Sequence, residues 1–170
     1  MLSINQLHQL VRLELDKALT RAIAAAKRAH ETATDTESIA KSKYETFGLE
    51  ASYLAHGQSM RVTQCQADIR DFEGMFARIN SNLSIEAKES NKPKVELGKL
   101  VALMDENGKS QYLFVGPGVG GLKIVEGNRS IMVVTLESPL GTAMANKRQG
   151  DVFSLIVAGN KREYEIIELV

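Results

Sequence analysis

The chain has 170 residues, of which 44% are hydrophobic and 25% are charged, a composition typical of one or two small globular domains. Its 21 basic and 21 acidic residues cancel, which argues against a general binder of duplex DNA, because such proteins usually carry a basic surplus. The single cysteine excludes an internal disulfide and a four-cysteine zinc site, and without a long apolar run or a secretory signal we expect a cytoplasmic protein that contacts no membrane.

Proline and glycine are distributed unevenly along the chain. The prolines are Pro93, Pro117 and Pro139, and ten of the 13 glycines follow residue 97. Because both residues disfavour helix interiors, the first half is free to form long helices and the second half is rich in turns. We therefore expect a helical domain over residues 1–80, a polar linker over 81–94 and a second domain over 95–170.

Two apolar stripes with steps of three and four residues occupy the first half, which is the pattern of amphipathic helices. A short turn between two such helices packs them antiparallel, as a helical hairpin. Beside Gly57 the second stripe slips at Gln58, which predicts a bend or local unwinding. The first stripe is Ile4, Leu7, Val11, Leu15, Ala18, Ala22, Ala25 and Ala29, and the second runs from Ala40 to Ile79 through Cys65.

The segment between the stripes, near residues 32–37, is the expected end of the hairpin. Its threonines and aspartate favour caps and turns, and either Thr34 or Asp35 is suited to cap the second helix. Three acidic residues lie at this end of the hairpin, namely Glu31, Asp35 and Glu37. The preceding stretch is basic, with Lys17, Arg21, Lys27 and Arg28.

A basic shaft beside an acidic end suits RNA phosphates and a metal ion respectively. Solvated charges on an exposed helix and its cap would give the same pattern, and the sequence leaves both interpretations open.

The second half has short apolar runs of strand type over residues 95–104, 112–115, 131–135, 152–157 and 164–170. Between two of them, residues 138–145 form a short helix, for which Ser138 is the natural N-cap and Pro139 the first helical residue. The expected fold class is α+β: a helical hairpin followed by a small antiparallel β domain with one short helix. The three histidines show no metal-ligand spacing, and Cys65 is expected to be a core residue.

Residues 131–170 resemble the C-terminal domain of the bacterial Gre transcript-cleavage factors, the GreA/GreB family. The family pattern is an apolar strand, Ser-Pro-Leu/Ile-Gly-x-Ala, Lys-x-x-Gly-Asp, a second strand, a glycine turn and Tyr/Phe-Glu-Ile. The resemblance implies a coiled-coil hairpin followed by an FKBP-like domain. The matching positions are Ser138, Pro139, Leu140, Gly141, Ala143, Lys147, Gly150, Asp151, Tyr164, Glu165 and Ile166.

The resemblance also implies a partner and a mechanism. Gre factors bind RNA polymerase through the C-terminal domain, which implies docking by Ser138, Pro139, Leu140 and Gly141. Their hairpin enters the secondary channel, and its acidic end helps to hold Mg²⁺ at the RNA 3′ end, a role that falls to Asp35 and Glu37 here. Lys17, Arg21, Lys27 and Arg28 would then contact RNA. The polymerase cuts its own transcript, so the factor is not a freestanding enzyme.

The acidic end departs from the family pattern, because Asp35 and Glu37 are two residues apart where the family has three. A regulator that enters the channel without stimulating cleavage is therefore an alternative, and a coiled-coil adaptor is another. The sequence does not indicate the oligomeric state.

Overall fold

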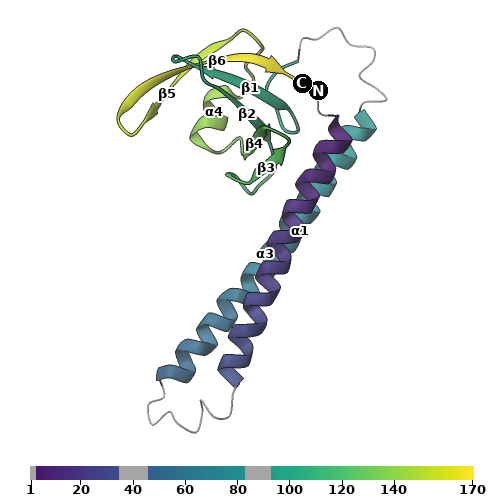
Figure 1. The fold of residues 1–170 in the computed structure, drawn as a ribbon, viewed down its shortest axis with the longest axis vertical. Helices are drawn as coiled ribbons and strands as arrows, with labels where there is room; N and C mark the ends of the chain where they lie inside the picture. Colours follow the sequence, from purple (N-terminus) through teal and green to yellow (C-terminus); the bar gives the residue numbers. More distant parts are fainter. Residues whose placement is uncertain (1–2, 35–45, 83–92) are drawn as a thin grey trace. The chain divides into compact units, whose positions relative to one another are not determined.

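The computed structural model describes residues 3–34, 46–82 and 93–170, and Figure 1 shows the helices and strands that they form. Two long helices, α1 (Ile4–Thr34) and α3 (Thr46–Asn82), precede a sheet region with one short helix. The described chain divides into two compact units, residues 11–70 and residues 1–10 with 71–170. Both long helices therefore contribute to both units. No helix in the described ranges is long and apolar enough to cross a membrane.

The unit of residues 11–70 is a two-helix hairpin, in which α1 and α3 run side by side in opposite directions (Figure 1). Its buried side chains fall on the predicted stripes, and Cys65 is among them, as predicted. Most of these residues are small, which lets the two helix backbones approach closely. The buried set is Val11, Leu15, Ala22, Ala29, Ala51, Cys65 and Ile69.

Helix α3 passes through Gly57 without interruption, so the predicted local unwinding does not occur. An added Cβ at Gly57 would meet no atom within 4 Å, so the glycine is not required by packing. Helix α1 begins with a reciprocal cap. The Gln6 amide donates to Ser3 Oγ over 3.2 Å and the Ser3 amide donates to Gln6 Oε1 over 2.9 Å.

The α1 helix continues further than the threonine-rich sequence predicts. Thr32 and Thr34 were expected in a turn, but both lie within the helix. Their hydroxyls donate to the carbonyls of Arg28 and His30, four residues earlier, over 2.9 Å each. This bond satisfies the hydroxyl inside a helix, so Thr34 ends α1 rather than capping the second helix. The alternative cap, Asp35, lies outside the described residues.

The second unit contains a six-stranded sheet with the order β3-β4-β2-β1-β6-β5. The strands are β1 (Leu100–Asp105), β2 (Ser110–Val115), β3 (Lys123–Glu126), β4 (Arg129–Val134), β5 (Val152–Val157) and β6 (Asn160–Leu169). The short helix α4 (Pro139–Met144) begins at the predicted cap, Ser138. The predicted fold class, a helical hairpin followed by a sheet domain with one short helix, is confirmed.

The sheet is mixed, whereas the sequence analysis expected antiparallel strands alone. Four of the five strand pairs are antiparallel, but β2 and β4 are parallel. The reason is that the chain leaves β2, forms the edge strand β3 and turns back, so the second strand of this β3–β4 hairpin lies next to β2 in the same direction. Because β3 has only four residues, with charges at both ends, its sequence did not indicate a strand.

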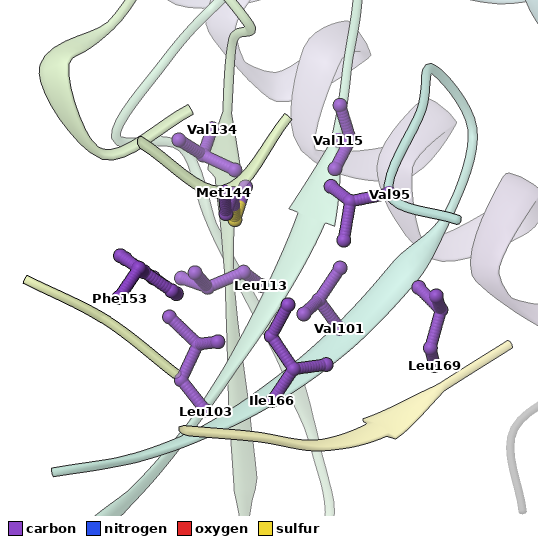
Figure 2. Close-up of a cluster of buried hydrophobic side chains, with 10 residues drawn as sticks. All are labelled: Val95, Val101, Leu103, Leu113, Val115, Val134, Met144, Phe153, Ile166 and Leu169. Atoms are coloured by element: carbon purple, nitrogen blue, oxygen red, sulfur yellow. The ribbon is translucent and has the colours of Figure 1, made fainter. Parts of the chain in front are cut away.

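One face of the sheet carries the hydrophobic core. Ten buried side chains converge there, and Figure 2 shows them pointing toward one another from several strands and from the α4 segment. Met144, the last residue of α4, is fully buried among them. The set is Val95, Val101, Leu103, Leu113, Val115, Val134, Met144, Phe153, Ile166 and Leu169.

The end of α3 packs against the sheet within the same unit. The Phe76 ring stacks on Phe114 of β2, with centroids 5.8 Å apart, and on His8 of α1, with centroids 4.3 Å apart. His8 Nε2 lies 3.0 Å from Glu73 Oε2. His8 is therefore a packing histidine, and the start of α1 and the end of α3 share a core with the sheet.

Two glycines, Gly116 and Gly98, allow the end of α3 to approach the sheet domain closely. A Cβ added to Gly116 would lie 2.8 Å from Val133 Cγ1 and 2.9 Å from Phe72 Cζ. One added to Gly98 would lie 2.5 Å from Ile79 Cδ1. The predicted linker, residues 81–94, falls largely outside the described residues, and the division at 1–80, 81–94 and 95–170 stays a prediction.

We expect Gly116→Ala to lower the free energy of unfolding by about 1–3 kcal/mol, because the added methyl overpacks the contact with Phe72 and Val133. The matched control is Gly74→Ala. Gly74 lies on α3, two residues after Phe72, and an added Cβ there meets nothing within 4 Å. That variant should gain about 1 kcal/mol from helix propensity. Urea denaturation measures both, and a loss in neither variant would contradict the described packing.

The two-residue turn between β5 and β6 generates a second prediction. Ala158 and Gly159 both have positive φ, 50° and 81°, as a type I′ turn requires. Asparagine adopts this conformation more readily than alanine, so Ala158→Asn should stabilise the protein by about 0.5–1 kcal/mol, and Ala158→Val should destabilise it. Thermal unfolding of both variants tests this, and shifts of the same sign would show that the turn is of another type.

Candidate functional site

The predicted acidic pair, Asp35 and Glu37, lies outside the described residues. The third acidic residue, Glu31, is on the last turns of α1 and is exposed. Its Oε1 lies 3.8 Å from Nζ of Lys27, one helical turn earlier, which is a solvent-exposed ion pair. Glu31 is therefore part of the helix rather than of the connecting segment.

The predicted RNA-binding residues all lie on α1, and their side chains are exposed. Lys17, Arg21 and Arg28 are four and seven residues apart, which places them within about 40° of one another around the helix and over roughly 16 Å of its length. We call these three residues the basic stripe. Lys27 projects about 80° away from Lys17 and faces Glu31 instead.

The basic stripe is only partly neutralised by neighbours. Lys17 Nζ lies 2.7 Å from Glu14 Oε1. Arg21 and Arg28 form no ion pair with any residue of the described ranges. Within the described residues no acidic side chain pairs with these two guanidinium groups, and guanidinium groups in general bind phosphate oxygens in bidentate geometry.

The predicted docking segment, residues 138–141, has a defined local structure. The Ser138 hydroxyl accepts a hydrogen bond from the Gly141 amide over 3.0 Å and donates one to the Thr135 carbonyl over 2.7 Å. Gly141 is buried, and an added Cβ would collide with the Thr135 carbonyl. Leu140 packs on the core. Three of the four residues therefore shape the segment, and Pro139 is exposed.

The exposed surface beside this segment contains two residues that the sequence analysis did not single out. Glu137 and Thr142 are exposed on either side of Pro139. The Thr142 hydroxyl donates to the Leu136 carbonyl over 2.9 Å, while the Ser138 side chain between them bonds to the Thr135 carbonyl and the Gly141 amide.

A shallow hollow lies on the sheet, with a volume of about 20 Å³. The Arg129 guanidinium sits 5.4 Å from the centre of the Tyr112 ring at this site, in cation–π geometry. The hollow holds about one water molecule, far less than a small-molecule site needs. The lining residues are Leu100, Ala102, Tyr112, Glu126, Arg129, Ile131, Glu168 and Val170.

Metal-ligating side chains do not cluster within residues 3–34, 46–82 and 93–170. The carboxylates predicted to bind a metal ion, Asp35 and Glu37, lie outside these ranges, so their separation stays untested.

Comparison with known proteins identifies the second half of the chain. Residues 89–169 match the family described as Transcription elongation factor, GreA/GreB, C-term. A transcription elongation factor GreA from Alkalilimnicola ehrlichii is 29% identical over 114 residues, which cover 67% of this chain and 68% of that protein.

Two solved structures of the transcription factor Gfh1 resemble the chain more weakly. One is 23% identical, covers 93% of this chain and 92% of its own, and has a TM-score of 0.39. The other, GreA factor homolog 1 from Thermus thermophilus, is 22% identical, covers 99% and 95%, and has a TM-score of 0.37. Residues 89–169 are therefore similar to the GreA/GreB C-terminal domain, as the resemblance to the Gre family predicted.

Proposed function

We propose that this protein is a transcription elongation factor that binds RNA polymerase, inserts its helical hairpin into the secondary channel and stimulates cleavage of backtracked RNA. The observation that carries the proposal is the match of residues 89–169 to the GreA/GreB C-terminal domain. The two-helix hairpin of residues 11–70 supports it, because a narrow rod is the shape that such insertion needs.

The chemistry would belong to the polymerase. Asp35 and Glu37 would supply hard oxygen donors, which Mg²⁺ prefers, at the end of the hairpin. When bound, Mg²⁺ would stabilise the charge that develops as the RNA phosphodiester is hydrolysed. This chain would contribute ligands and position, so it would be no enzyme by itself.

The basic stripe would hold the displaced RNA. Arg21 and Arg28 are exposed and have no ionic partner in the described ranges, so they can approach phosphates without breaking an existing ion pair. Lys17 adds a third positive charge on the same face, partly offset by Glu14. Because phosphate contacts release counterions, this binding would weaken as salt concentration rises.

The C-terminal domain would anchor the factor on the polymerase. Ser138, Leu140 and Gly141 fix the start of α4, and Glu137, Pro139 and Thr142 form its exposed surface. The anchor proposed here is that exposed surface, with the buried residues acting as its support. An FKBP-like fold for this domain and a cytoplasmic location remain expectations.

A second candidate is a regulator that occupies the channel without stimulating cleavage. The two-residue spacing of Asp35 and Glu37 favours it, because residues two apart on a regular helix do not face each other. The two candidates share the polymerase partner and differ only in whether a 3′ RNA fragment is released.

The cleavage proposal predicts the outcome of removing both tip carboxylates. Asp35→Ala combined with Glu37→Ala should abolish release of a short 3′ RNA fragment from a stalled, backtracked bacterial polymerase, while binding to the polymerase persists. Glu106→Ala with Glu163→Ala, which removes the same charge from two exposed positions of the other domain away from the proposed anchor, should retain cleavage. Cleavage by the tip variant at the parental rate would overturn the assignment. No cleavage by the parent, with binding intact, would favour the second candidate.

The basic stripe predicts a salt-dependent effect. Arg21→Glu with Arg28→Glu should weaken binding to the backtracked complex by at least about tenfold, since a charged hydrogen bond contributes about 1.5–3 kcal/mol. It should also flatten the dependence of affinity on salt. Lys109→Glu with Lys123→Glu makes the same change in net charge on the sheet domain and should leave both unchanged. Equal losses in the two variants would mean that total charge, rather than the stripe, sets the affinity.

A further inference from the structure

The two edges of the six-stranded sheet differ in how they are protected. Strand β3 forms one edge and is short, with Lys123 and Glu126 at its ends. Strand β5 forms the other edge and has the sequence VFSLIV, without charge or proline. Natural sheets usually blunt their edges with short strands, charges or proline, because an open edge pairs with other strands. Strand β5 lacks these three devices.

The backbone of β5 has an unused side. In an antiparallel pair, alternate residues bond to the partner strand and the others point away. The two-residue turn makes Val157 and Asn160 a bonded pair, and Ile166 donates to the Asp151 carbonyl over 3.0 Å at the other end. The outward groups therefore belong to Val152, Ser154 and Ile156. Nothing in the described ranges forms a backbone hydrogen bond with them.

The side chains of the same three residues are exposed, as is that of Val157 at the end of the strand. Val152 is 58% exposed and Ile156 is 75% exposed, the highest value among the large hydrophobic residues described. Between them Ser154 is also exposed. The alternate residue Phe153 points to the other face and is buried in the core. An apolar row and a row of free backbone groups thus coincide on one strand.

This row is self-complementary. If two copies of β5 pair antiparallel about a two-fold axis at Ser154, Val152 of each copy lies opposite Ile156 of the other. The three outward-pointing residues then form three bonded pairs, each exchanging two N–H···O bonds. Shifting the register by two residues would place Ala158, in its positive-φ turn, in the pairing and lose this match.

The flanking charges agree with the same register. Within one copy, Val152 pairs with Glu165 of β6, and Ile156 pairs with Lys161. Across two paired copies, each row of side chains would run from Lys161 of one, through Ile156 and Val152, to Glu165 of the other. Opposite charges therefore end each apolar row, and no two like charges lie directly opposite.

We infer that this protein forms a two-fold homodimer through antiparallel pairing of β5 with β5 of a second copy, joining the two sheets into one. A single six-residue strand buries less area than a standard interface, so the dimer is weak and reversible. The inference depends on the sheet edge alone and does not depend on the proposed function.

Sedimentation equilibrium on the full chain tests the dimer. The weight-average mass should rise from 18.7 kDa toward twice that value as concentration increases. Ile156→Glu should hold the mass at the monomer value, because the dimer would place the added carboxylate beside Val152 of the second copy and remove the apolar contact between the two copies. Val125→Glu, at a 66% exposed residue of β3, is the matched control and should dimerise like the parent. A parent that stays monomeric, or an Ile156→Glu dimer, overturns the inference.

Disulfide cross-linking tests the register, in a Cys65→Ala background. With Ser154 at the axis, the Cα atoms of the two Ser154 residues, one from each copy, lie about 5.5 Å apart, which is within disulfide range. Ser154→Cys should therefore give a cross-linked dimer on mild oxidation. The matched control is Val157→Cys, which places the thiols of the two copies about 20 Å apart and should therefore give no cross-linked dimer. Equal cross-linking of both, or of neither, contradicts the register. If β5 amides become protected from hydrogen exchange only when polymerase is added, the edge belongs to that partner and the inference fails.

Discussion

The contact of α3 with the sheet is the constraint on which the rest of this molecule depends. Phe72 and Phe76 are almost fully buried, and Phe76 lies between the His8 and Phe114 rings. Glycine at 116 leaves the space that Phe72 occupies. Because the start of α1 joins this cluster through His8, residues from the first turns of α1 and the last turns of α3 belong to the same compact unit as the sheet.

Much of this fold follows from the sequence because its signals are local and repeated. Apolar steps of three and four residues identified the stripe that buries Val11, Leu15 and Ala22, and the Ser138–Pro139 pair identified the start of α4. The run VFSLIV predicted β5 with its observed limits. The predictions that failed concerned features that depend on distant parts of the chain or on exceptions to local rules. Strand β3 is too short to show a pattern, and the parallel β2–β4 pair depends on where β3 lies. Helix α1 extends to Thr34, whose hydroxyl bonds to the backbone carbonyl of His30.

At the candidate site, too, some features could be predicted from the sequence and others could not. Sequence placed Lys17, Arg21 and Arg28 on one exposed helix, and the structure gives each an exposed side chain. Sequence could not show that Lys17 and Lys27 have ionic partners while Arg21 and Arg28 lack them in the described ranges, because ion pairs depend on rotamers. The Ser138 motif alone also could not show which residues fix the start of α4 and which form its exposed surface. The hydrogen bonds of Ser138 and the burial of Gly141 make that distinction, and they direct attention to Glu137, Pro139 and Thr142.

The central claim is that the far end of the hairpin reaches the RNA 3′ end inside a polymerase. The most direct measurement is site-specific photo-cross-linking from Glu31→Cys, near the last turn of α1, in a Cys65→Ala background. With a backtracked complex, the account predicts cross-links to the 3′ segment of the RNA. A label at Asn107→Cys, in the β1–β2 turn of the sheet domain, should reach protein only. RNA cross-links from Asn107→Cys and none from Glu31→Cys would contradict the account.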